Sequence, residues 1–343
     1  MASREKDGLR VLCLDGGGVK GLATLQVLKK LEEIHGPLHE IFDVIAGTST
    51  GSLIAAGIAA RRLSCADMEA MYEALIPAVF TTGFASKLAR AVDKGEFQDS
   101  TAVEAALQNE FGECGSLASL GTKPALLVIA SKRTDEDSGY APRVFSSYDK
   151  ACDVPVWQAL RCSTAANFYF QPFQIGDTHY RDGGLVANNP TKEVLRLLLD
   201  RDAAATPKIA ALVSLGTGSV AAEPAPQPAP RSRPRCTFVA TASEATADWS
   251  RTTSEHARAL AVAASSLPYP GLDVDATHQD VIHLISVLHP TIIAPSRYIR
   301  LQPRLDFTVK LDDASRAALD HLIQAGATFA DEVLEDLEDI PLS

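Results

Sequence analysis

The chain has 343 residues, of which 46% are hydrophobic and 22% are charged, and its formal net charge is −11 at pH 7. This composition is typical of a globular protein with one large α/β domain or two small ones. The acidic balance argues against a nucleic-acid-binding protein, whose domains are usually basic. It also argues against strong charge-driven adhesion to anionic membranes.

Signals for export, membrane insertion and disulfide formation are not recognisable in the sequence. The first ten residues, MASREKDGLR, are polar and contain no apolar core of a secretory signal, and no 18 apolar residues run together. The six cysteines form no C-x-x-C pair, which favours reduced thiols over a disulfide or zinc framework. We therefore expect a soluble cytoplasmic protein.

Short apolar runs alternate with helical patterns in the first part of the chain. LRVLCLD (residues 9–15) predicts a buried strand, and LATLQVLKKLEEI (22–34) predicts an amphipathic helix with leucines along one face. IFDVIAG (41–47) predicts a second strand, and SLIAAGIAARR (52–62) a buried helix. Such alternation indicates a mainly parallel sheet with helices on both faces.

The later segments add strands, helices and one proline-rich stretch. Strands are expected near residues 124 and 209 and over residues 297–303. The other segments predict helices and loops, in chain order 64–111, the exposed proline-rich loop 221–236, the helix 243–264 and the closing helix 314–339. We expect one domain over residues 8–310, with a C-terminal helical segment, 311–343, packed on it.

Gly16, Gly18 and Gly21 spell G-x-G-x-x-G between the first strand and the first helix. A dinucleotide-binding loop has this pattern, but it needs an acidic residue at the end of the second strand, and here Asp43 lies near that strand's beginning. Asp15, just before the glycines, would also repel a pyrophosphate. The structural alternative is a plain tight turn. Because glycines at a helix N-terminus present backbone N–H groups to negative charge, we expect the loop to hold an oxyanion.

A candidate nucleophile follows the second strand. Gly47-x-Ser49-x-Gly51 lies between a predicted strand and a predicted helix, the context in which G-x-S-x-G forms a nucleophile elbow. A Ser or Thr that only caps the helix is the alternative. A serine hydroxyl also needs a base within hydrogen-bonding reach.

Two residues are candidates for that base. In HYRDGGLVANNP (residues 179–190), Asp182 is followed by two glycines and is expected to lie on a turn. Because glycines have no side chain, another loop can approach this turn closely. A carboxylate base needs partial burial to raise its pKa. His256 is the alternative, because Ser49, Asp182 and His256 would reproduce the chain order of a hydrolase triad. The adjoining Asn188-Asn189-Pro190 predicts the start of a helix.

Three motifs, DGGGVKG (15–21), GTSTG (47–51) and DGG (182–184), occur in this order. Together they resemble the patatin-like phospholipase family and the calcium-independent phospholipases within it. The likeness continues in VSLGTG and YIRLQP and spans residues 10 to about 305. The resemblance implies a three-layer α/β/α fold with a mainly parallel central sheet, and it makes residues 8–310 the acyl hydrolase domain.

The resemblance also implies a Ser–Asp dyad in place of a triad. On this sequence, Ser49 would attack an ester carbonyl, Asp182 would take its proton, and the amides of Gly16, Gly17 and Gly18 would hold the oxyanion. The remaining motif positions would support the turns around this site: Asp15, Lys20, Gly21, Gly47, Gly51, Gly183 and Gly184. Neither a metal ion nor a cofactor is implied.

The resemblance implies a calcium-independent serine lipid acyl hydrolase, of phospholipase A or lysophospholipase type, for phospholipids or other polar glycerolipids. An acyltransferase using the same dyad and a catalytically silent lipid-binding module are the alternatives. Many family members carry arginine where this chain has Lys20, and lysine lacks the planar bidentate fork. FASKLARAVDKGEF (84–97) predicts either an interfacial helix that touches the membrane or an ordinary surface helix.

Overall fold

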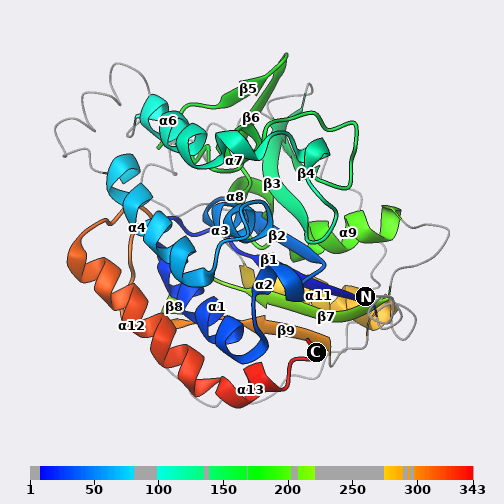
Figure 1. Ribbon diagram of the computed structural model, residues 1–343, viewed down its shortest axis with the longest axis vertical. Helices are drawn as coiled ribbons and strands as arrows, with labels where there is room; N and C mark the ends of the chain where they lie inside the picture. Colours follow the sequence, from blue (N-terminus) through cyan, green and yellow to red (C-terminus); the bar gives the residue numbers. More distant parts are fainter. Residues whose placement is uncertain are drawn as a thin grey trace, which may run out of the picture.

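The computed structural model describes residues 8–80, 99–134, 139–167, 169–201, 208–220, 274–288, 293 and 297–342. Figure 1 shows a central sheet with helices packed around it. The sheet has eight strands, and seven of them follow the order β5-β6-β3-β2-β1-β7-β9. Their bounds are β1 Leu9–Leu14, β2 Val44–Thr48, β3 Ala125–Arg133, β5 Phe173–Ile175, β6 Thr178–Asp182, β7 Ile209–Leu215 and β9 Tyr298–Leu301.

The centre of the sheet is parallel and one edge is antiparallel. β1 pairs in parallel with β2 and β7, β2 with β3, and β7 with β9. β6 and β4 (Tyr140–Ser146) pair with β3 in the antiparallel sense, as β5 does with β6. The short strands β8 (Ser219–Val220) and β10 (Arg304–Leu305) form a separate parallel pair. The predicted α/β fold with a mainly parallel central sheet is therefore confirmed.

Helices cover both faces of the sheet. The first layer packs against inward side chains such as Leu12 and Leu14, and its helices are α1 Gly21–His35, α2 Leu38–Ile41, α3 Thr50–Ala59, α4 Cys65–Phe80, α6 Ser100–Phe111, α7 Val156–Ser163 and α12 Arg316–Glu332. The second layer packs against Val11 and Cys13, and its helices are α8 Gly184–Ala187, α9 Thr191–Arg201 and α11 Val274–Leu288. Alternate residues of β1 thus face opposite layers, as expected of a strand buried on both sides.

The closing segment differs from the single helix that the sequence predicts. α12 ends at Glu332, and a second helix, α13 (Leu334–Glu338), follows after a change of backbone direction at Val333. The change of direction buries Leu337 and brings its carbonyl to the imidazole of His35 at the end of α1. Both helices contact α1, so the end of the chain is packed on the first helix layer.

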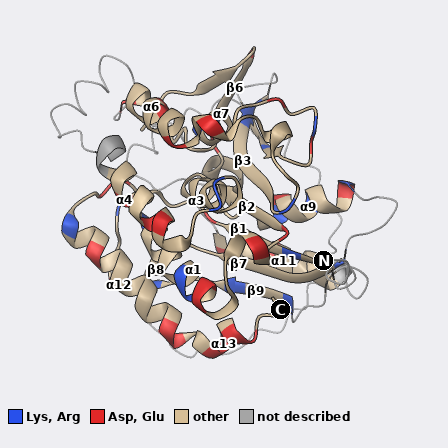
Figure 2. Ribbon diagram, viewed as in Figure 1, with Lys and Arg blue, Asp and Glu red and all other residues tan. Residues whose placement is uncertain are grey.

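Several predicted features lie outside the described residues. They are the interfacial or surface helix over 84–97, the proline-rich loop over 221–236 and the helix over 243–264 that contains His256. Charged residues lie mainly on the outer helices, including α12 and α13, and the strands beneath them are largely uncharged (Figure 2). Within the described ranges, no helix combines the length and apolar character needed to cross a membrane.

Candidate active site

The candidate site lies where neighbouring strands end. β1 and β2 are adjacent and parallel, with Leu14 paired to Gly47, so the segments that follow them emerge at the same edge of the sheet. The first of these segments is the glycine loop, and the second begins with Ser49. β6 runs antiparallel to β3 and ends with Asp182 paired to Ala130. The topology therefore brings together three motifs that are far apart in the sequence (Figure 1).

Ser49 occupies a sharp turn between β2 and α3. Its φ of 52° and ψ of −122° lie in a region that non-glycine residues rarely adopt. The flanking glycines permit this turn, because a Cβ atom at Gly47 would lie 2.1 Å from the carbonyl oxygen of Gly51. A Cβ at Gly51 would lie 2.3 Å from the carbonyl oxygen of Leu14. This strand–turn–helix geometry is that of a nucleophile elbow.

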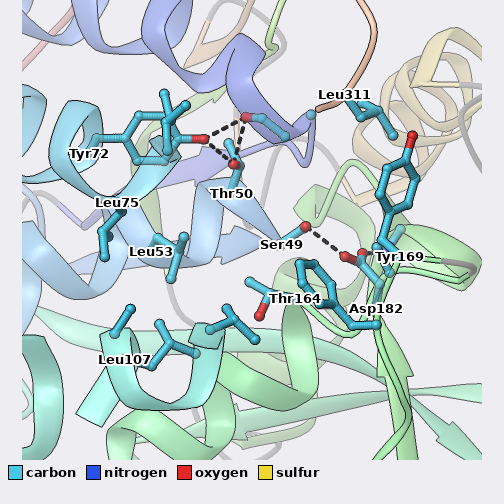
Figure 3. A pocket seen from close by; sticks show the side chains of 18 of the residues that line it. Ser49, Thr50, Leu53, Tyr72, Leu75, Leu107, Thr164, Tyr169, Asp182 and Leu311 are labelled. Atoms are coloured by element: carbon cyan, nitrogen blue, oxygen red, sulfur yellow. Dashed lines mark hydrogen bonds between the residues drawn. The ribbon is translucent and has the colours of Figure 1, made fainter. Parts of the chain in front are cut away.

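The Ser49 hydroxyl donates a hydrogen bond of 2.7 Å to Oδ2 of Asp182 (Figure 3). The other carboxylate oxygen, Oδ1, accepts a hydrogen bond of 2.7 Å from the Gly184 amide. Asp182 is only 4% exposed, and burial raises its pKa to about 6, while the hydrogen bonds from Ser49 and Gly184 act in the opposite direction. Burial thus brings the pKa of Asp182 closer to neutral pH, the range in which a carboxylate could accept a proton.

The turn after Asp182 fits closely against β3. A Cβ atom at Gly183 would lie 2.3 Å from the carbonyl oxygen of Ile129, so only glycine allows this approach. Ser163 links the same strand to the nucleophile, because its hydroxyl donates to the Ile129 carbonyl and accepts a 2.8 Å hydrogen bond from the Ser49 amide. Ser49 and Asp182 are therefore both held against β3.

The three amides predicted to bind the oxyanion have different surroundings. The Gly16 amide donates a 3.1 Å hydrogen bond to the Asn188 carbonyl, so this donor is already used within the fold. Gly17 and Gly18 line the same pocket as Ser49 and Asp182. The structure therefore narrows the candidate oxyanion donors from three amides to those of Gly17 and Gly18.

Three further residues of the first motif, Asp15, Lys20 and Gly21, do not line the Ser49 pocket. Asp15 forms a buried ion pair with Arg300, with N–O distances of 2.9 and 2.6 Å. Lys20 lines a separate cavity of about 250 Å³ and is not among the residues that line the Ser49 pocket. Burial lowers the pKa of Lys20, and the charge of Asp15 opposes this effect. Gly21 allows α1 to begin close to α3, because a Cβ there would lie 2.6 Å from Cγ2 of Thr50.

Comparison with known proteins gives a match over the region that contains these three motifs. A family model described as patatin-like phospholipase matches residues 12–195, which is just over half of the chain. The chain belongs to the patatin-like phospholipase family. The matched residues include the glycine loop, the Ser49 turn and the Asp182 turn.

Two curated relatives show how far the similarity extends. The calcium-independent phospholipase A2-gamma of Mus musculus is 32% identical over 226 residues, which are 62% of this chain and 28% of that protein. Phospholipase A I of Arabidopsis thaliana is 29% identical over 280 residues, covering 63% of this chain and 21% of that protein. The match therefore spans less than a third of either relative. The crystal structure of VipD from Legionella pneumophila aligns with 96% of this chain and 67% of that chain, at a TM-score of 0.45 and 13% identity.

In this patatin-like chain, the pocket that contains Ser49 and Asp182 is largely apolar. Side chains from α3, α4, α6 and the segment after α7 line it, and they include Leu53, Tyr72, Leu75, Ile76, Val103, Leu107, Tyr169 and Phe170 (Figure 3). Within the described part of the chain, none of the residues that line the pocket is a histidine, and no cluster of three His, Cys, Asp or Glu side chains could hold a metal ion.

Two residues that hold the glycine loop, Asn188 and Tyr72, are not recognisable from the sequence. Asn188 lies in the NNP run that predicts a helix start, but it is Asn189 whose side chain caps α9, by accepting from the Thr191 amide. The Asn188 side chain instead donates to the carbonyl of Gly16 at 3.2 Å, which ties the glycine loop to the Asp182 turn. Tyr72 on α4 contacts the glycine loop as well, and no motif in the sequence announces it.

Proposed function

We propose that this protein is a calcium-independent serine lipid acyl hydrolase of phospholipase A or lysophospholipase type. The observation that carries the proposal is the 2.7 Å hydrogen bond from Ser49 to a buried Asp182 at the base of an apolar pocket. The family match and the phospholipase relatives support the same class of reaction. Its substrates would be phospholipids or other polar glycerolipid esters.

In the first half of the proposed reaction, Ser49 Oγ attacks the ester carbonyl carbon while Asp182 takes the hydroxyl proton. The carbonyl oxygen becomes an oxyanion, which the amides of Gly17 and Gly18 would stabilise. The tetrahedral intermediate then collapses, and Asp182 returns the proton to the departing alcohol. An acyl-enzyme on Ser49 remains.

In the second half, water attacks the acyl-enzyme with Asp182 again accepting a proton. The fatty acid leaves and Ser49 recovers its proton from Asp182. The raised pKa of Asp182, about 6, supports this role, because a base works best when its pKa lies near the operating pH. An ordinary aspartate, with a pKa near 4, would be a weaker proton acceptor.

The pocket lining supports a lipid substrate. Leu53, Leu75 and Leu107 come from three different helices and surround the space next to the Ser49 hydroxyl (Figure 3). Burial of each methylene of an acyl chain is favourable by about 0.8 kcal/mol, so such a wall would hold a fatty-acyl chain in place for attack. Access to aggregated lipid would require transient contact with a membrane surface.

The experiment that tests the proposal measures fatty-acid release from mixed phospholipid vesicles in excess chelator. We expect release by the wild-type protein and none by the Ser49→Ala and Asp182→Asn variants, each shown to be folded by circular dichroism. Equal release by all three proteins would contradict the site assignment. Wild-type release that requires added calcium would contradict calcium independence, and acyl transfer to an added lysolipid or alcohol in place of hydrolysis would indicate an acyltransferase.

A further inference from the structure

Two hydroxyl groups hold the carbonyl of Gly18 in the glycine loop. Thr50 Oγ1 donates to the Gly18 oxygen at 2.8 Å, and the Tyr72 hydroxyl donates to the same oxygen at 2.5 Å (Figure 3). The two hydroxyls are also within hydrogen-bonding distance of each other. Thr50 directly follows Ser49, whereas Tyr72 comes from α4. Burial raises the pKa of Tyr72, so its phenol remains a proton donor throughout the neutral range.

The peptide groups on both sides of Gly18 are fixed. The peptide after it is held at its carbonyl by Tyr72 and Thr50 and at its N–H by a 2.9 Å hydrogen bond from Val19 to the Leu311 carbonyl. The peptide before it is held by a 3.2 Å hydrogen bond from the Lys20 amide to the Gly17 carbonyl. The Gly18 N–H lies between these anchors, so its direction is set by them.

The conformation of Gly18 shows why such anchors are needed. Its φ of +57° lies in the left-handed region, and a Cβ atom there would lie 2.1 Å from the Leu311 carbonyl oxygen. A glycine has more backbone freedom than any other residue, so without external contacts its amide would sample several directions. A displacement of about 1 Å at a reacting centre can cost roughly 100-fold in rate.

We propose that Tyr72 is a positioning residue for the proposed hydrolase: together with Thr50 it fixes the direction of the Gly18 amide that would bind the oxyanion. This inference rests on the proposed function. Tyr72 itself touches neither Ser49 Oγ nor Asp182 in the dyad; it acts through the loop. Because Leu75 and Ile76, on the next turn of α4, line the pocket, the same helix would contact the acyl chain and hold the oxyanion loop.

The test uses steady-state hydrolysis of soluble p-nitrophenyl butyrate, so that vesicle binding does not enter. We expect Tyr72→Phe, which keeps the ring in the pocket, to lower kcat by about 10- to 100-fold with KM within about twofold of the wild-type value. Thr50→Val should lower kcat in the same way, and Thr50→Ser, which restores a hydroxyl, should recover most of that loss. A merely structural contact would lower thermal stability without changing kcat per folded molecule.

Tyr298→Phe is the matched control. It removes a half-buried phenol hydroxyl that lies outside the pocket and is hydrogen-bonded to His278 at 2.9 Å and to Ser214, so it tests the loss of a hydroxyl that has no described hydrogen bond to the glycine loop. We expect its kcat to equal that of the wild type. If Tyr72→Phe does not fold, the contrast between Thr50→Val and Thr50→Ser tests the same contact.

The outcomes separate the two proposals. Wild-type turnover with an unchanged kcat in both Tyr72→Phe and Thr50→Val would overturn the positioning role and leave the proposed function standing. A wild-type protein that neither hydrolyses the ester nor reacts at Ser49 with a fluorophosphonate would overturn the proposed function and the positioning role together.

Discussion

The sequence Asp-Gly-Gly occurs twice at the site, at residues 15–17 and 182–184, and the two copies have different chemistry. Each aspartate is buried at the end of a strand of the same sheet. Arg300 neutralises Asp15 through a bidentate ion pair, whereas the carboxylate of Asp182 accepts hydrogen bonds only from the Ser49 hydroxyl and the Gly184 amide among its described contacts. The local sequence is the same in both turns, but the distant partner decides whether the carboxylate is a counterion or is free to act as the base proposed above.

Replacing Asp182 should give the largest effect on activity. We expect Asp182→Asn to lower kcat/KM for an ester by at least about 1,000-fold, because Ser49 loses its proton acceptor while the turn is kept. Initial rates with p-nitrophenyl butyrate measure this loss. Asp15→Asn should retain far more activity per folded molecule, and equal losses in the two variants would contradict the division of roles.

Replacing Asp15 should give the largest effect on stability. Asp15→Asn leaves the Arg300 guanidinium buried without its counterion, which should lower the free energy of unfolding by about 3 kcal/mol. Urea denaturation at pH 7 measures the change. Asp280→Asn is the control, because it breaks an exposed ion pair with Lys192 and should cost less than about 1 kcal/mol. Similar costs for the two variants would show that the Asp15 pair is not effectively buried.

The close approach of the Asp182 turn to β3 predicts an intermediate effect on stability. Gly183→Ala places a methyl group 2.3 Å from the Ile129 carbonyl oxygen, so the turn or β3 must shift, at a cost of about 2 kcal/mol. Gly112→Ala is the matched control, since the φ of Gly112 is −61° and no atom lies within 4 Å of the added methyl group. Thermal unfolding compares the two variants, and an undiminished Tm in Gly183→Ala would contradict the tight approach.

The raised pKa of Asp182 predicts the smallest effect, a pH-dependent change in stability. Because burial favours the protonated form, the folded state binds this proton more tightly than the unfolded state, and the resulting stabilisation is lost as the pH rises through about 6. Asp182→Asn removes this dependence. The free energy of unfolding of Asp182→Asn minus that of the wild type should therefore be about 1 kcal/mol higher at pH 8 than at pH 5. Parallel urea titrations at both pH values measure the difference, and a constant offset would contradict the shifted pKa.

The parts of the fold that follow from short-range patterns were predictable from sequence. The apolar runs around Leu12, Ile45 and Leu212 became strands of the parallel centre, because a strand buried on both faces needs continuous apolar residues. The leucines of α1 became a buried face for the same kind of reason. The glycine spacing also predicted the sharp turn at Ser49.

The parts of the site that depend on long-range contacts were not predictable from sequence. Nothing near Asp15 in the sequence shows that Arg300, 285 residues away, would neutralise it. The use of the Gly16 amide by Asn188 and the contact of Tyr72 with Gly18 also arise only when distant elements pack together. Which groups of the glycine loop are already bonded within the fold therefore emerges only from the tertiary structure.

The rate at which a fluorophosphonate labels Ser49 between pH 5 and 8 tests whether Asp182 is the base for Ser49. We expect the wild-type rate to rise through a single ionisation near pH 6, because labelling requires ionised Asp182. Asp182→Asn, still folded, should label at least about 100-fold more slowly and without that ionisation. If the labelling rate of Asp182→Asn follows the same pH profile as that of the wild type, Asp182 is not the base and another residue must take the proton of Ser49.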